Sequence, residues 1–347
     1  MMTAGKTANW LANNDDYLIL THRRPDGDTL GCAGALASEL RRMGKNAYVL
    51  KNPEITSMFA DLVSDFIAPD GYEPKHVISV DTASADLLPF NAMPYSEKIS
   101  LCIDHHISTR INAEFKCVDA DRASCGELMY DILIELCGNI SPEAAGCLYT
   151  AIATETGCFA YANTTAESLK IASKLVQAGA PHKKMNKSYF RTKTRSRVKL
   201  EAMIYSNMEF YFDGAAAIVS ITQQMLAEIE AGENDLNDIS ALAGVVEGVT
   251  CAVTIRELGS KNVSKVSVRS LPGINSNDIC ARLGGGGHAM AAGATVAKSI
   301  EDTKAEVLLI LEEVFGHYDP LAQCGAPSQS HTGSAEDCSS KNAMTNI

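Results

Sequence analysis

Short apolar runs alternate with amphipathic segments along the first half of the chain. Residues 17–20 form a continuous apolar run, and apolar positions at helical spacing follow over residues 30–43, closed by Gly44. A continuous apolar run predicts a strand buried on both faces, as in a parallel sheet. Further strands are predicted over residues 46–50, 77–80 and 99–103. This β-α-β alternation indicates a doubly wound α/β sheet, which binds ligands beyond the carboxyl ends of its strands.

The second half of the chain has a different pattern. A hairpin is predicted over residues 208–220, turning at Asp213-Gly214, and a strand pair over residues 249–269. Helical spacing is present over residues 127–136, 142–153, 168–178, 223–231, 276–283 and 300–315. We therefore predict two α/β domains with a linker and a disordered polar tail, divided as residues 1–181, 182–207, 208–318 and 319–347.

The predicted linker is helical and strongly basic. Eight Lys and Arg residues fall between positions 183 and 199, with no acidic residue among them. A charge run of this kind is usually a solvated helix face. In an acidic protein it can also guide a polyanion towards a binding site, and the sequence leaves both interpretations open.

Composition narrows the class of protein. The chain has 347 residues, 46% apolar content and a net charge of −12, which suits a soluble globular protein and argues against one that coats duplex nucleic acid. No apolar run approaches the roughly 20 residues of a membrane helix. Eleven cysteines without a CxxC pair, and no signal peptide, predict a cytoplasmic protein.

Candidate metal ligands follow three of the predicted strands. They are His22, Asp26 and Asp28 after the first strand, Asp81 after residues 77–80, and Asp104, His105 and His106 after residues 99–103. An isolated Asp after a strand is more often a helix N-cap than a ligand. Together, however, so many carboxylates at one sheet edge would repel one another unless cations lay between them. Carboxylates and imidazoles without thiolates suit Mn²⁺ or Mg²⁺, and two such ions about 3.5–4 Å apart are the usual apparatus of phosphoester hydrolysis.

The order of these motifs resembles a known family. Asp104-His105-His106, with His22-x-x-Pro25-Asp26-Gly27-Asp28 before it and Gly284 to His288 near the end, is similar to the DHH/DHHA1 phosphoesterases. The branch it most resembles is the oligoribonuclease (nanoRNase)/pAp-phosphatase type, over roughly residues 15–316. The resemblance implies a DHH domain that holds metal, a DHHA1 domain that holds substrate, and a substrate-binding cleft between them.

The resemblance also implies roles for individual residues. One metal site would comprise His22, Asp26 and Asp81, and a second Asp28, Asp81 and His105, with Asp81 bridging two divalent ions, Mn²⁺ or alternatively Mg²⁺ or Co²⁺. His106 would contact the scissile phosphate and Asp104 would orient the histidines. The implied substrate residues are Arg269, Gly284, Gly285, Gly286, Gly287 and His288, although a Gly-rich turn is also common in loops without a ligand.

Two positions depart from the family pattern. Glu155 stands in a Thr-Glu-Thr-Gly sequence where the family usually has Asp, and its extra methylene would move the second ion or make its binding bidentate. Cys32 replaces a usual Ser and is expected to pack against the sheet.

The expected function is hydrolysis of very short oligoribonucleotides to nucleoside 5′-monophosphates, with 3′-phosphoadenosine 5′-phosphate (pAp) as a further substrate. Two alternatives remain at this point: a phosphodiesterase for linear or cyclic dinucleotides of the cyclic di-AMP type, and a non-catalytic nucleotide-binding module. The expected partners are short RNA or nucleotides, with no long duplex and no membrane, and a homodimer is compatible with the sequence.

Overall fold

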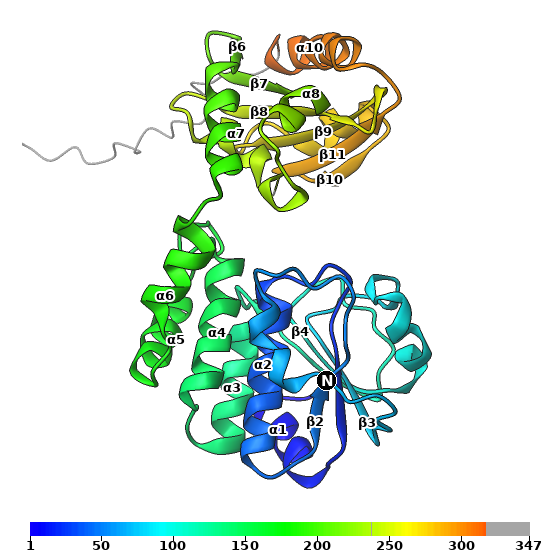
Figure 1. Ribbon diagram of the computed structural model, residues 1–347, viewed down its shortest axis with the longest axis vertical. Coiled ribbons are helices and arrows are strands. Elements are labelled where there is room, and N and C mark those ends of the chain that lie inside the picture. The colour runs from blue at the N-terminus through cyan, green and yellow to red at the C-terminus, as the bar shows by residue number, and fades with distance from the viewer. Residues whose placement is uncertain (237, 317–347) are drawn as a thin grey trace, which may run out of the picture. The chain divides into compact units, whose positions relative to one another are not determined.

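The computed structural model describes residues 1–236 and 238–316. The chain folds as two compact units, the first spanning Met1–Thr192 and the second beginning at Lys193 (Figure 1). The boundary between the units lies inside the stretch 182–207 that the sequence predicts as a linker. The predicted tail, 319–347, lies outside the described residues.

A five-stranded parallel sheet forms the centre of the first unit. Its strands run in the order β2-β1-β3-β4-β5, which confirms the predicted α/β fold. Their bounds are β1 Tyr17–Leu20, β2 Ala47–Val49, β3 His76–Val80, β4 Ile99–Asp104 and β5 Phe115–Val118.

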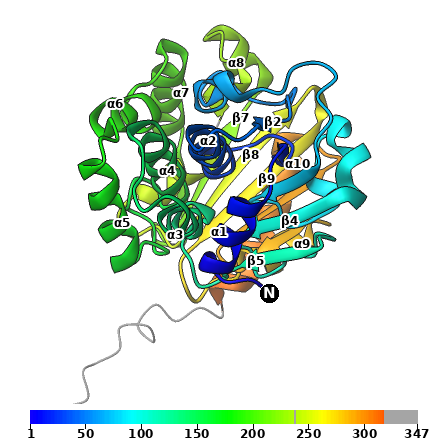
Figure 2. The same cartoon turned by 90° about the horizontal axis from the view of Figure 1, so that it is seen from below.

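Both faces of this sheet are buried, as the apolar run of β1 predicts. Tyr17 and Ile19 pack into a core shared with helices on one face, while Leu18 and Leu20 pack on the opposite face against 3₁₀ segments. Figure 2 shows α2, α3 and α4 gathered on one side of the sheet. The helices of this unit are α1 Ala4–Asn13, α2 Gly27–Arg42, α3 Cys125–Cys137, α4 Pro142–Glu155, α5 Ala166–Gln177 and α6 His182–Asn186. The 3₁₀ segments are Ala60–Leu62, Ser64–Phe66, Ala85–Leu87 and Phe90–Lys98.

Two of the helix boundaries that differ from the sequence prediction affect candidate ligands. Helix α2 begins at Gly27 rather than near residue 30, because the Asp26 carboxylate accepts hydrogen bonds from the N–H groups of Asp28 and Thr29, both at 3.1 Å. Asp28 therefore lies in the first helical turn. Helix α4 continues to Glu155, which ends the helix instead of standing in a loop.

The basic stretch is helical, as predicted, but it is not one helix. Helix α6 continues into a π-helix, Lys187–Arg191, and α7, Arg195–Ser206, begins after an extended break at Thr192 to Thr194. The Thr194 side chain caps α7 by accepting from the N–H of Arg197 at 2.9 Å.

A mixed six-stranded sheet organises the second unit, in the order β10-β11-β9-β8-β7-β6. Only β7 and β8 pair in parallel. The strands are β6 Glu209–Tyr211, β7 Ala216–Ile221, β8 Cys251–Leu258, β9 Ser260–Ser270, β10 Gly286–His288 and β11 Ala291–Val296. Helices α9 Ser276–Arg282 and α10 Ile300–Gly316 share a core with one face, and α7, α8 Gln223–Glu228 and the 3₁₀ segment Ile239–Val245 share a core with the other.

The predicted hairpin of this unit is confirmed by the antiparallel pairing of β6 with β7. The predicted strand pair is also present, and the turn between β8 and β9 is tight because Gly259 alone separates the strands, with φ +48°. Part of the predicted glycine loop is also strand, since Gly286 pairs with Gly293 of β11. In the described part of the chain, no helix combines the length and apolar character that crossing a membrane requires.

Candidate metal centre

Three neighbouring strands deliver the candidate ligands to one edge of the sheet. His22 follows β1, Asp81 comes directly after β3, and Asp104 is the last residue of β4. Because β1, β3 and β4 are parallel neighbours, their carboxyl ends meet. Asp81 has a left-handed backbone, φ +49°, which Asp tolerates better than most residues and which turns its side chain out of the strand direction.

Two ligand clusters share the Asp81 carboxylate. One comprises Asp81, His105 and His106, the other His22, Asp26 and Asp81, and within each the ligand atoms lie no more than 4.8 Å apart. A cavity of about 200 Å³ opens onto both clusters. Its lining residues are His22, Asp26, Asp81, Ala83, Leu87, His105, His106 and Glu155.

Backbone carbonyls fix the protonated nitrogen of two of these histidines. Nδ1 of His22 lies 2.8 Å from the carbonyl of Arg23, and Nδ1 of His105 lies 3.2 Å from that of Arg122. Each Nδ1–H therefore donates to a carbonyl, which leaves Nε2 with a free electron pair. Nε2 of His105 lies 3.6 Å from Oδ1 of Asp81. Both imidazoles thus present a metal-binding nitrogen towards the carboxylates.

His106 is held differently, by a carboxylate. Its Nδ1–H donates to Oδ1 of Asp104 at 2.8 Å, and Asp104 also accepts from the Thr109 hydroxyl. The bond to Asp104 raises the pKa of His106 to about 9. Burial favours a higher pKa for Asp104, but the hydrogen bonds from His106 and Thr109 outweigh burial and lower it. Asp104 is therefore a charged anchor for the His106 ring.

Asp28 lies deeper than the other carboxylates and is held by a helix N-terminus. Its oxygens accept from the N–H groups of Cys125 at 2.8 Å and Gly126 at 2.9 Å, the first residues of α3, and from the Cys32 thiol at 3.5 Å. Nε2 of His105 lies 3.8 Å from its Oδ2. The structure thus brings Asp28 to the edge of the site without placing it in either cluster.

Burial and mutual repulsion disfavour the charged forms of Asp28, Asp81 and Glu155. Loss of solvent raises the pKa of Asp28, Asp81 and Glu155, and the negative charges around them raise it further. For Asp81 and Glu155 the nearby His105 and His106 only partly oppose this effect. Either protonation of the carboxylates or a bound cation reduces this repulsion.

One carboxylate oxygen of the site has the environment expected of a metal ligand. Oδ1 of Asp81 is buried and accepts no hydrogen bond from any described residue, although Oδ2 accepts one from the Thr29 hydroxyl at 2.7 Å. Buried carboxylate oxygens are normally paired, because an unpaired one loses its hydration without replacement. The donor set around it is imidazole nitrogen and carboxylate oxygen, which suits a divalent cation of the Mn²⁺ or Mg²⁺ class.

Glu155 reaches the same cavity from the helical side of the sheet. It is the last residue of α4, and its charge acts on Asp28 and His106. It belongs to neither close cluster. The structure therefore brings together all the candidate ligands of the first unit around the cavity, with Asp28 and Glu155 at its margins.

The candidate substrate residues of the second unit also form one group. Arg269 of β9 pairs with Ala291 of β11, and Ala291 pairs with His288 of β10, so Arg269 and His288 share a row and a face of the sheet. A Cβ atom at Gly285 would lie 2.2 Å from the carbonyl oxygen of Gly293, and one at Gly287 would lie 2.6 Å from Cα of Ala292. These two glycines are thus required by close backbone packing.

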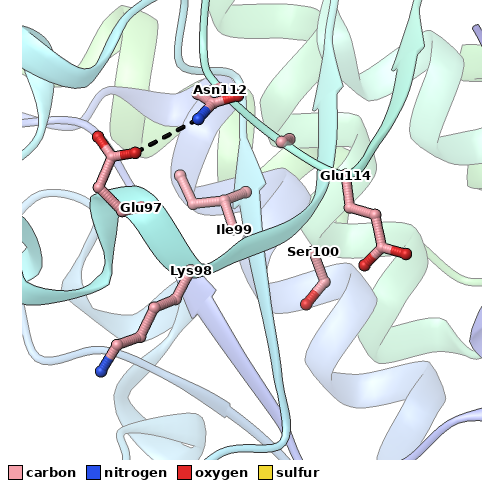
Figure 3. Close-up of a pocket in the computed structure, with 7 residues that line it drawn as sticks. Glu97, Lys98, Ile99, Ser100, Asn112 and Glu114 are labelled. Atoms are coloured by element: carbon pink, nitrogen blue, oxygen red, sulfur yellow. Dashed lines mark hydrogen bonds between the residues drawn. The ribbon is translucent and has the colours of Figure 1, made fainter.

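A second cavity of about 230 Å³ is unrelated to the metal centre. It opens at the start of β4, whereas Asp104 ends that strand, about 17 Å away at 3.3 Å per residue. Figure 3 shows its polar rim, where Asn112 donates to Glu97 at 3.3 Å. The lining residues are Glu97, Lys98, Ile99, Ser100, Asn112, Ala113 and Glu114, with no imidazole or thiol among them.

Sequence reasoning missed the side chains that hold the ligands in place. Thr29 bonds both Asp26 and Asp81, and Thr109 bonds Asp104. Thr29 follows Asp28 directly, and a hydroxyl next to a candidate ligand could have been predicted to hold a ligand in place. Thr109, five residues after Asp104, offered no comparable signal.

Comparison with known proteins agrees with this arrangement. The model described as "DHH family, N-terminal domain" matches residues 16–152, and the model described as "DHHA1 domain" matches residues 221–316. The chain is 31% identical to the bifunctional oligoribonuclease and PAP phosphatase NrnA of Thermus thermophilus, over 80% of this chain and 83% of that one. It is 27% identical to the protein of the same name from Bacillus subtilis, over 81% of this chain and 90% of that one.

Among solved structures, an exopolyphosphatase-related protein from Bacteroides fragilis has the same fold. Its TM-score is 0.77 at 23% identity, over 92% of this chain and 96% of that one. Together with the two ligand clusters and the two matched domains, these similarities show that the chain belongs to the DHH/DHHA1 phosphoesterase family.

Proposed function

We propose that the protein hydrolyses phosphoester bonds in very short oligoribonucleotides, releases nucleoside 5′-monophosphates, and also removes the 3′-phosphate of pAp. The observation that carries this proposal is the Asp81 carboxylate, which two ligand clusters share and whose buried Oδ1 has no hydrogen-bond partner in the described part of the chain. A shared carboxylate is the usual bridge between two ions.

His22, Asp26 and Asp81 would hold one divalent ion, and Asp28, Asp81, His105 and Glu155 the other. Mn²⁺ is the best match to mixed imidazole and carboxylate ligands, with Mg²⁺ or Co²⁺ as substitutes. When bound, the two ions lower the pKa of the attacking water and neutralise charge on the phosphoryl oxygens.

His106 has a different role, because its Nδ1–H is committed to Asp104. Its Nε2 remains for the substrate, where it stabilises the phosphoryl oxygens or gives a proton to the leaving oxygen. Asp104 is a positioning residue, since it acts only by fixing the His106 ring and holding it in the protonated form.

Arg269, His288 and the Gly284–Gly287 backbone of the second unit would bind anionic groups of the substrate. Arg269 offers a planar pair of donors to phosphate or carboxylate, and glycine N–H groups can approach an anion closely. The names of the relatives from Thermus thermophilus and Bacillus subtilis support oligoribonucleotides and pAp as the substrate class.

A hydrolysis panel tests the proposal. The protein with added Mn²⁺ is compared on pApA, longer oligoribonucleotides, pAp, cyclic di-AMP and pyrophosphate, with a chelator as the blank. We expect pApA and pAp to be cleaved, and cleavage to disappear in Asp81→Ala but to persist in Asp61→Ala, whose carboxylate is exposed on a 3₁₀ turn of the same unit.

Each other outcome selects a different function. Fastest cleavage of cyclic di-AMP would indicate a cyclic dinucleotide phosphodiesterase that uses the same ligands. Nucleotide binding without cleavage of any substrate would indicate a binding module, and restored cleavage in Glu155→Asp would then identify Glu155 as the cause.

A further inference from the structure

Four basic side chains line the solvent side of α6 and the following π-helix. Lys183, Lys184, Lys187 and Arg191 are all exposed, and we call them the basic stripe. Three of them recur at steps of four residues, so they project from one side of the helix. Within the described residues, the ion pairs of this stretch involve Lys193 and Arg197 with Glu201, and none involves the stripe.

Packing on the opposite side fixes the direction in which the stripe faces. The Thr150 hydroxyl of α4 contacts Sδ of Met185 at 3.6 Å, and the ring of Tyr189 lies 5.2 Å from that of Phe59. Phe190 packs on the core of the first unit. The stripe therefore belongs to a helix anchored on the first unit.

One loop connects the metal cavity with the stripe. Glu155 lines the cavity, and the ring of Tyr161, 56% exposed, covers Gly157 so closely that a Cβ there would lie 2.4 Å from it. The loop continues through Phe159, whose ring centroid lies 5.9 Å from that of Tyr149 on α4. The same Tyr149 ring lies 6.2 Å from that of His182, the first residue of α6. The loop that starts at the cavity and the helix that carries the stripe therefore pack around one side chain.

The charge of the stripe identifies the kind of partner. The chain carries a net charge of −12, so four exposed cations along α6 and the π-helix, without an ion pair among the described residues, run against its overall charge. The stripe runs about 12 Å from Lys183 to Arg191 at 1.5 Å per residue, enough for about two or three phosphates of a single strand. Tyr161, an exposed aromatic ring on the loop that starts at the cavity, adds a feature that is typical of surfaces that bind single strands.

We propose that the basic stripe binds the phosphates of a single-stranded RNA whose scissile bond lies at the metal centre, so that strands longer than a dinucleotide gain affinity from it. This inference rests on the proposed oligoribonuclease function. On this proposal a dinucleotide is too short to reach the stripe and is bound without it.

The test compares two double variants that each remove two positive charges. Lys187→Gln/Arg191→Gln alters the stripe, and Lys6→Gln/Lys98→Gln is the matched control on α1 and at the opposite end of the sheet. KM and kcat are measured for di- and heptanucleotide RNA in Mn²⁺. Binding of a labelled heptanucleotide is measured by fluorescence anisotropy in chelator, at several salt concentrations.

The expected result is a selective loss of affinity for the longer strand. A phosphate contact contributes a salt slope of about 0.7, which equals about fivefold in affinity at 0.1 M salt. The stripe variant should therefore raise the heptanucleotide KM about 5- to 25-fold and flatten the salt slope by about 1.4. Its kcat and its dinucleotide KM should stay within about twofold of the control variant.

Equal heptanucleotide KM and binding in the two variants would overturn the inference, as would an equal rise in KM for both strand lengths. If the wild-type protein cleaves neither strand, the proposed function is wrong, and the anisotropy measurement alone tests whether the stripe binds RNA. Salt-dependent binding that is lost only in the stripe variant then supports the inference, and equal binding refutes it.

Discussion

Replacing Asp81 by Asn distinguishes the stability that this buried carboxylate costs the metal-free protein from the stability that it provides by binding metal. Asn keeps the left-handed backbone that Asp81 adopts at φ +49°, and its side-chain oxygen can still accept from the Thr29 hydroxyl. The change removes one negative charge from a buried position. Since burial and Asp26 raise the pKa of Asp81, the metal-free protein should prefer the neutral side chain.

The magnitude follows from the distance between Asp81 and Asp26. Their ligand atoms lie within 4.8 Å of each other, where two charges repel by at least about 3.5 kcal/mol at an effective dielectric constant of about 20. Because the Asp26 side chain is 53% exposed, solvent screening reduces this to about 1–2 kcal/mol. For a unit of this size, Asp81→Asn should raise the melting temperature of the metal-free protein by about 2–8 °C.

The assay is thermal unfolding at several pH values, in chelator and in Mn²⁺, with Asp61→Asn as the exposed control. A carboxyl whose pKa is raised on folding stabilises the protein fully below its unfolded pKa of 3.8, and that stabilisation is lost as the pH rises through the folded pKa. The gap between wild type and Asp81→Asn should therefore be small near pH 4 and widen towards pH 8. In Mn²⁺ the wild type should gain stability and the variant should not.

Two results would refute this reasoning. One is a metal-free Asp81→Asn protein that is less stable than the wild type at pH 8. The other is an equal gain in melting temperature from Mn²⁺ in both proteins, which would mean that Asp81 does not hold the ion.

Three further predictions concern other parts of the chain. In metal-free Asp104→Asn, the pKa of His106 should fall from about 9 towards its ordinary value, as followed by NMR titration, and an unchanged pKa would contradict the anchoring role. Gly31→Ala places a Cβ 2.5 Å from the carbonyl oxygen of Cys147, and should cost about 1–3 kcal/mol in urea unfolding. Burial raises the pKa of Glu201, but hydrogen bonds from Lys193 and Arg197 outweigh burial and lower the pKa below 4.5, a stabilisation present above that pH and lost as the pH falls below it. Glu201→Gln should therefore cost about 1–2 kcal/mol at pH 7 and little near pH 3.

The strands that carry the ligands could be predicted because their signal is local. The predicted strand over residues 17–20 has the bounds of β1, since four apolar residues in a row must be covered on both faces wherever they lie. The parallel order then brings Asp81 and Asp104 together without further information. The DHH motif adds the histidines.

What holds the ligands could not be predicted, because those contacts are distant in sequence. The N–H groups that bind Asp28 belong to Cys125 and Gly126, almost a hundred residues later. Similarly, the sequence around Gly286 predicts a loop, and Gly286 is in a strand only because it pairs with β11. The 3₁₀ segment Phe90–Lys98 packs on the sheet, but it contains Pro94 and polar residues without a clear period. Its hydrophobic pattern therefore does not predict this packing.

The position of Glu155 at the end of α4 links metal binding to local order. The carboxyl end of a helix carries a partial negative charge, so a carboxylate there loosens the last turn. A cation held by Glu155 would reverse this effect and tighten the turn together with the residues that follow it. Amide hydrogen exchange at Thr156 to Tyr161 should then slow when Mn²⁺ is added, so this loop would report metal occupancy in the absence of any substrate.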